Sequence, residues 1–118
     1  MCYRPTMKSV MVFALALLST GAFAACEEPA VGSNAAPALS PPLAAVVVGN
    51  GRLPFHSAPQ AGCAMPGVFV IPKDALIAYA QTKNWTSVMY SHPRTGNTVS
   101  GWVRSSRLKM TGTVGPRQ

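Results

Sequence analysis

Short apolar runs, separated by turn residues, fill the last two thirds of the chain. Leu53 and Phe55 alternate with Pro54 and His56, as on a half-buried strand, whereas runs such as Val46–Val48 and Val68–Ile71 are continuously apolar, and no run keeps the 3.6-residue period of an amphipathic helix. β-Branched and aromatic residues are frequent in them, which favours strands. The pattern predicts an all-β fold of five to six short antiparallel strands, drawn from residues 46–48, 53–56, 68–71, 75–81, 85–91, 98–104 and 109–113.

The connections between these runs are typical of tight turns. Thr82–Asn84 separates two of the runs, and Pro93–Asn97 places Gly96 where a hairpin turn favours a positive φ. Residues 57–67 are rich in Pro, Gly and Ala and are expected to form a long loop. Short strands joined in this way, within about 65 residues, predict a small barrel.

The first 24 residues have the three parts of a secretory signal peptide. Arg4 and Lys8 provide a basic start, residues 10–18 are apolar, and Ala22-Phe23-Ala24 fits the small-residue cleavage site. The apolar stretch is too short to span a bilayer, which needs about 20 residues. Met1 and Met7 are alternative starts of translation, because Met7 is followed directly by the basic residue Lys8. We therefore expect residues 1–24 to direct export.

Residues 25–45 separate this signal from the strand-rich part. The stretch has four prolines, many alanines and no aromatic residue, so little apolar area is available for burial. The composition predicts a disordered linker, with the folded domain spanning residues 46–118.

Two cysteines remain after removal of the signal, and two interpretations of them stay open. Phe23–Cys26 resembles the lipobox of bacterial lipoproteins, in which the cysteine becomes an acylated N-terminus. Alternatively, Cys26 pairs with Cys63 in an oxidising compartment. In the chain-entropy model such a cross-link contributes roughly 3–4 kcal/mol, which is valuable for a domain this small.

The charge distribution restricts the partners. From Gly49 onward the chain has eight basic residues and Asp74 as its single acid. Such a surface favours anionic partners, and export disfavours nucleic acid among them. A membrane contact is expected only through a lipid on Cys26.

Three segments resemble the bacterial Src-homology-3-like (SH3-like) domains. Leu53–Pro59 is similar to their opening strand and loop, Asn84–Val88 to the Asn-Gly-Trp start of a later strand, and Gly101–Leu108 to their Gly-Trp-Val ending. The segments occur in the family's order, and the resemblance spans residues 51–113. It implies an SH3-like barrel in which the last segment runs from a strand into one 3₁₀ turn.

The resemblance also implies a binding surface. Trp85 would face a ligand, Tyr90 would extend an aromatic surface, and Trp102 would lie near the surface on the face opposite Val103. The family's acidic loop has no counterpart here, because residues 60–66 contain no carboxylate. Arg104 and Arg107 would instead hold carboxylates in a bidentate manner.

We therefore expect a non-catalytic binding module of the periplasm or cell envelope, which contacts peptidoglycan or an envelope protein. The single acid of the domain excludes a paired-carboxylate glycosidase, and neither a cofactor nor a metal is expected. The alternative is a secreted inhibitor or immunity protein that blocks a partner enzyme with its basic face. The oligomeric state is left open.

Overall fold

The computed structural model describes residues 26–114, which form an antiparallel sheet with no α-helix among them. The predicted signal peptide, residues 1–24, lies outside the described residues. Among residues 26–114, no helix is long and apolar enough to cross a membrane. The all-β prediction is confirmed, but residues 26–114 contain seven strands instead of five to six. The strands are β1 (Ala38–Val47), β2 (Leu53–His56), β3 (Ala64–Val70), β4 (Ala75–Gln81), β5 (Trp85–Ser91), β6 (Thr98–Arg104) and β7 (Leu108–Thr113).

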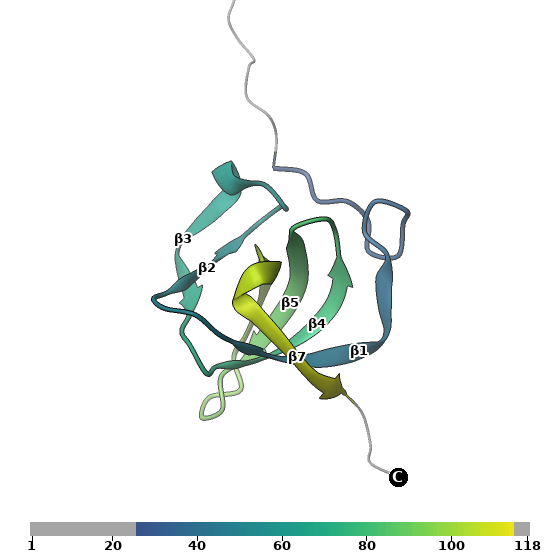
Figure 1. Ribbon diagram of the computed structural model, residues 1–118. Helices are drawn as coiled ribbons and strands as arrows, with labels where there is room; N and C mark the ends of the chain where they lie inside the picture. Colours follow the sequence, from purple (N-terminus) through teal and green to yellow (C-terminus); the bar gives the residue numbers. More distant parts are fainter. Residues whose placement is uncertain (1–25, 115–118) are drawn as a thin grey trace, which may run out of the picture.

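The strands follow the order β3-β2-β6-β5-β4-β1-β7 in a single sheet. The sheet is curled (Figure 1), but β3 and β7 remain as its two edges, so the hydrogen-bonded order does not close into a barrel. The β4–β5 and β5–β6 hairpins have the turns expected from the sequence. The β5–β6 hairpin is paired without a break from Trp85↔Arg104 to Ser91↔Thr98.

One hydrophobic core lies on the inner face of the curled sheet. Six strands contribute to it, because alternate residues of each strand point inward. Val103 is fully buried there, as predicted, and Leu108 packs against it while partly exposed. The core residues are Val47, Leu53, Phe55, Val70, Leu76, Ala78, Val88 and Val103.

The prediction of a disordered linker through residue 45 is wrong. β1 begins at Ala38 and pairs with β4 on one side and β7 on the other, and Ala45 is buried. Prolines at positions 41 and 42 are tolerated because the β1–β4 register is interrupted between Ala38 and Leu43. Tertiary pairing thus orders a stretch whose composition is typical of disorder.

The described part of the chain has two 3₁₀ turns, where one was expected. The expected one, Ser105–Arg107, connects β6 to β7. The other, Ala61–Cys63, lies within the predicted loop of residues 57–67, and β3 begins directly after it at Ala64.

Candidate functional site

The β5–β6 hairpin divides the predicted site residues between two faces of the sheet. Side chains alternate between faces along a strand, and opposite residues of an antiparallel pair share a face. Trp85 is paired with Arg104, and Tyr90 with Val99, five residues further along β5. Trp85 and Arg104 therefore lie on the outer face, whereas Tyr90 lies on the inner face with the core.

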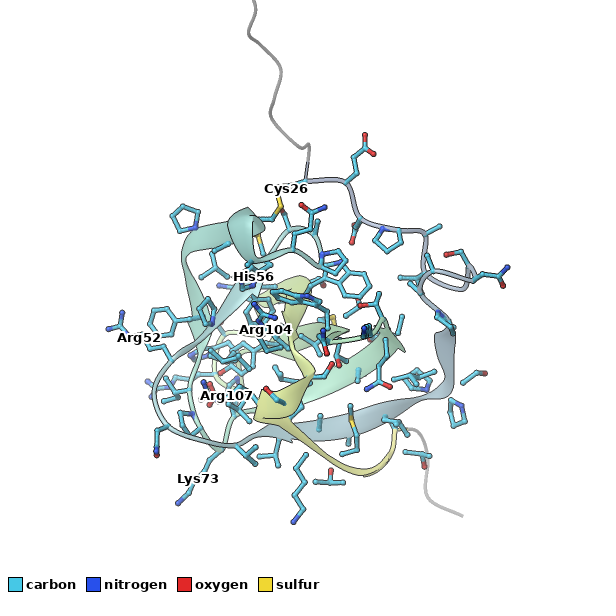
Figure 2. The ribbon with its side chains drawn as sticks, turned by 45° about the horizontal axis from the view of Figure 1, so that its top comes forward. Cys26, Arg52, His56, Lys73, Arg104 and Arg107 are labelled. Atoms are coloured by element: carbon cyan, nitrogen blue, oxygen red, sulfur yellow. A yellow bond between two sulfur atoms is a disulfide. The ribbon has the colours of Figure 1, made fainter. Side chains whose placement is uncertain are left out.

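Trp85 and Arg104 form a stack on the outer face. The guanidinium carbon of Arg104 lies 4.2 Å from the centroid of the Trp85 ring, and the His56 ring meets Trp85 edge-on at 4.6 Å. Trp85 is only 7% exposed, while Arg104 is exposed. Figure 2 shows His56 and Arg104 in the same part of the molecule. Trp85 thus serves as a platform beneath Arg104 more than as a free surface for stacking.

Hydrogen bonds hold the backbone on either side of this stack in place. The Thr86 hydroxyl is buried and lies 2.7 Å from the Ser105 hydroxyl. The Ser105 amide donates to the Asn84 carbonyl oxygen at 2.9 Å. These bonds connect the turn that precedes Trp85 to the residue that follows Arg104, so both side chains are positioned by the backbone.

Trp102 lies on the outer face, opposite Val103, as predicted, but the expectation that it stays near the surface is wrong. It is 0% exposed, because the N-terminal segment, residues 26–37, passes over it. Its indole Nε1 donates to the Glu28 carboxylate at 2.8 Å, and Ala36 is fully buried against the two tryptophans and Ala80. Trp102 could contact a ligand only if this segment moved.

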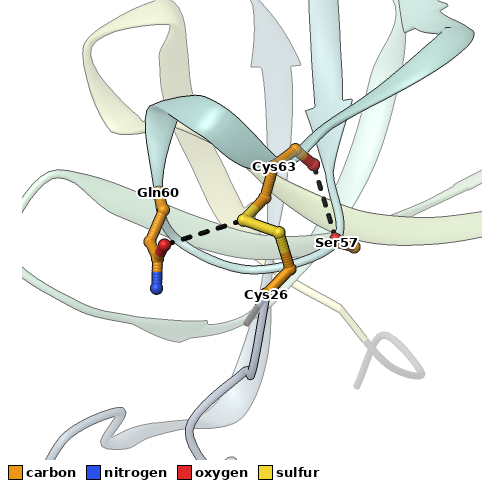
Figure 3. Close-up of a disulfide and its surroundings, with 4 residues drawn as sticks. All are labelled: Cys26, Ser57, Gln60 and Cys63. Atoms are coloured by element: carbon orange, nitrogen blue, oxygen red, sulfur yellow. Dashed lines mark hydrogen bonds between the residues drawn. A yellow bond between two sulfur atoms is a disulfide. The ribbon is translucent and has the colours of Figure 1, made fainter. Parts of the chain in front are cut away.

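A disulfide between Cys26 and Cys63 fixes the start of the N-terminal segment (Figure 3). The Cys63 carbonyl oxygen accepts from the Ser57 amide at 2.9 Å, which holds the second cysteine in its turn. Of the two interpretations of Cys26, the structure contains the disulfide. A sulfur in that bond cannot carry a lipid thioether, nor act as a nucleophile.

Arg107 does not join the stack. Its Nε donates to the Val48 carbonyl oxygen at 2.6 Å and its Nη2 to the Gly51 carbonyl oxygen at 2.7 Å. Arg107 therefore clamps the β1–β2 turn. The predicted pair of carboxylate-binding arginines is not brought together.

Two contributors to the outer face were not found by sequence reasoning. The sequence predicts His56 only as part of a strand and Glu28 as part of a linker, yet His56 supports Trp85 and Glu28 binds Trp102. Residues of both the N-terminal segment and the sheet line a cavity of about 370 Å³, Glu28, Ser87 and Ser100 among them. No local pattern marks Glu28, because its partner is 74 residues away.

Within residues 26–114, no group of three or more His, Cys, Asp or Glu side chains is arranged to hold a metal ion. Trp85 and Arg104 are the predicted site residues that the fold brings into contact, and the Arg104 guanidinium is the group there that can bind an anion. Comparison with known proteins finds no family model, no curated protein and no solved structure that matches this chain.

Proposed function

We propose that this protein is a non-catalytic, exported binding module that holds a carboxylate-bearing ligand through Arg104. The stack of Arg104 on Trp85 carries the proposal, because it orients an exposed guanidinium without using its hydrogen-bond donors. No hydrogen bond or ion pair of the Arg104 side chain is found within the described part of the chain. A planar guanidinium held in this way can bind a carboxylate with two parallel bonds.

Peptidoglycan is the ligand that we propose, since its peptide stems carry carboxylates. The resemblance to SH3-like domains supports this choice, together with the 3₁₀ turn between β6 and β7 where the family has one. The Cys26–Cys63 bond suits a protein of an oxidising compartment outside the cytoplasm. The excess of basic residues after Gly49 would add long-range attraction to an anionic polymer.

Binding to isolated sacculi tests the proposal. The wild type should co-sediment with sacculi, and Arg104→Ala should lower the affinity about tenfold, as expected for loss of a charged hydrogen-bonded contact. Arg104→Lys should recover only part of the binding, because an ammonium cannot form the planar bidentate contact. Lys109→Ala is the matched control, because it removes one exposed charge from β7.

Equal losses for Arg104→Ala and Lys109→Ala would indicate nonspecific attraction by net charge and would refute the site. Full binding by Arg104→Lys would refute the bidentate geometry. Amidation of the stem carboxylates should abolish the difference between wild type and Arg104→Ala.

A further inference from the structure

A second surface lies at the opposite end of β5, where the hydrophobic core reaches the outside of the molecule. A groove of about 330 Å³ runs between β3 and the β5–β6 hairpin. Val68, Tyr90 and Val99 line it, and all three also pack against the core. Phe69 borders the groove and is 39% exposed, one of the largest apolar side chains on the described surface.

The groove also has a strand edge that no other described strand pairs with. β6 is paired with β5 along its whole length, but with β2 only through His56↔Trp102. Thr98 and Val99 line the groove, and the edge of β6 at these two residues is not paired with β2. Alternate backbone amides and carbonyls of such a flank can pair with an added extended segment.

One wall of the groove, at Tyr90 and His92, is held by contacts within the protein. The His92 Nδ1 accepts hydrogen bonds from the backbone amides of Arg94 and Thr95, at 3.1 and 3.3 Å. The His92 ring also meets the Tyr90 ring edge-on. These contacts orient the His92 ring without a ligand. A preorganised wall lowers the entropy that a bound segment would have to offset.

Charge defines the partner. The Arg52 guanidinium stacks on Phe69 at 4.3 Å, and Arg94 is exposed in the hairpin turn beside His92. Among the described residues, none that lines the groove is acidic. We infer that the groove binds an extended acidic segment of a partner protein, which adds to β6, places apolar side chains on Tyr90 and Val99, and directs carboxylates to Arg52 and Arg94.

The probe is a seven-residue peptide that alternates glutamate with valine and is blocked at both ends; a lysine–valine peptide is the counterpart. Titration into ¹⁵N-labelled protein should shift the amides of residues 67–69 and 98–100 with the acidic peptide only. The double variant Arg52→Ala/Arg94→Ala should lower the affinity about tenfold, with a few-fold loss from each charge. Phe69→Ser should weaken binding to a similar extent, because it removes the apolar wall.

Two controls make the result decisive. Lys83→Ala/Lys109→Ala removes two exposed charges elsewhere and should leave peptide affinity within twofold of wild type. Arg104→Ala should also leave it unchanged, so this groove and the Arg104 site succeed or fail separately. Unchanged affinity in Arg52→Ala/Arg94→Ala, equal binding of the lysine peptide, or shifts centred on residues 85 and 104 would each overturn the inference.

Discussion

Removal of the Cys26–Cys63 bond should destabilise the protein mainly through the unfolded chain. The bond closes a loop between residues 37 positions apart, for which the chain-entropy model gives about 4 kcal/mol. The N-terminal segment has little else to hold it, since Ala36 is its only fully buried residue and the Glu28–Trp102 bond its main side-chain contact. In Cys26→Ala/Cys63→Ala we therefore expect lower stability and partial exposure of Trp102.

Urea unfolding followed by tryptophan emission measures both effects. For a domain of this size, with a slope of roughly 1–2 kcal/mol/M, the loss of about 4 kcal/mol lowers the unfolding midpoint by about 2–4 M. Native-state emission should also shift to the red, because Trp102 loses its cover. Wild type kept in excess dithiothreitol is the matched control and should coincide with the double variant. A midpoint within 0.5 M of the oxidised wild type, with unchanged emission, would refute this reasoning.

Three substitutions test how close contacts fix the sheet, each by urea or thermal unfolding. Gly101→Ala should cost about 1–3 kcal/mol, because the added methyl would lie 2.9 Å from a backbone carbonyl oxygen and from two packed side chains; a neutral result would show that the strands can separate at this point. Arg107→Ala should cost about 2–3 kcal/mol by releasing the β1–β2 turn, whereas loss of sacculus binding at unchanged stability would contradict the clamp. Gly49→Ala should also destabilise, since Gly49 has a φ of +89° and its Cβ would lie 2.6 Å from the Arg107 Nε. If Gly49→Ala were as stable as wild type, the tight approach of that guanidinium to the turn would be wrong.

The strands that the sequence predicts well are those whose signals are local. β5 and β6 are rich in β-branched and aromatic residues and have a glycine-containing turn between them, and their predicted bounds agree with the structure. β1 has such a signal only at its end, in Val46 and Val47, because its residues 38–45 are all Ala, Leu, Ser or Pro. It becomes a strand because β4 and β7 present edges that its backbone can pair with, and the sequence does not display those edges.

The candidate site was predictable to the same local extent. Alternation correctly places Trp102 on the face opposite Val103, but burial depends on what covers that face. The cover is the N-terminal segment, and its position depends on a disulfide and on a carboxylate far away in sequence. Likewise, Arg104 and Arg107 are three residues apart, yet the 3₁₀ turn between them directs one to Trp85 and the other to the β1–β2 turn. Spacing in sequence does not settle the direction of side chains across such a turn.

The positions of the two proposed surfaces on β5 make them independent of each other. Trp85 begins the strand on its outer face and Tyr90 lies five residues on, facing inward, so about 17 Å of extended backbone separates them. Neither the Arg104 stack nor the groove shares a side chain with the other. Energetic effects of substitutions at such separations usually add. In our proposal, binding of a cell-wall carboxylate at Arg104 therefore leaves the groove free to bind an acidic segment. Together the two sites would let this small domain attach a partner protein to the cell wall.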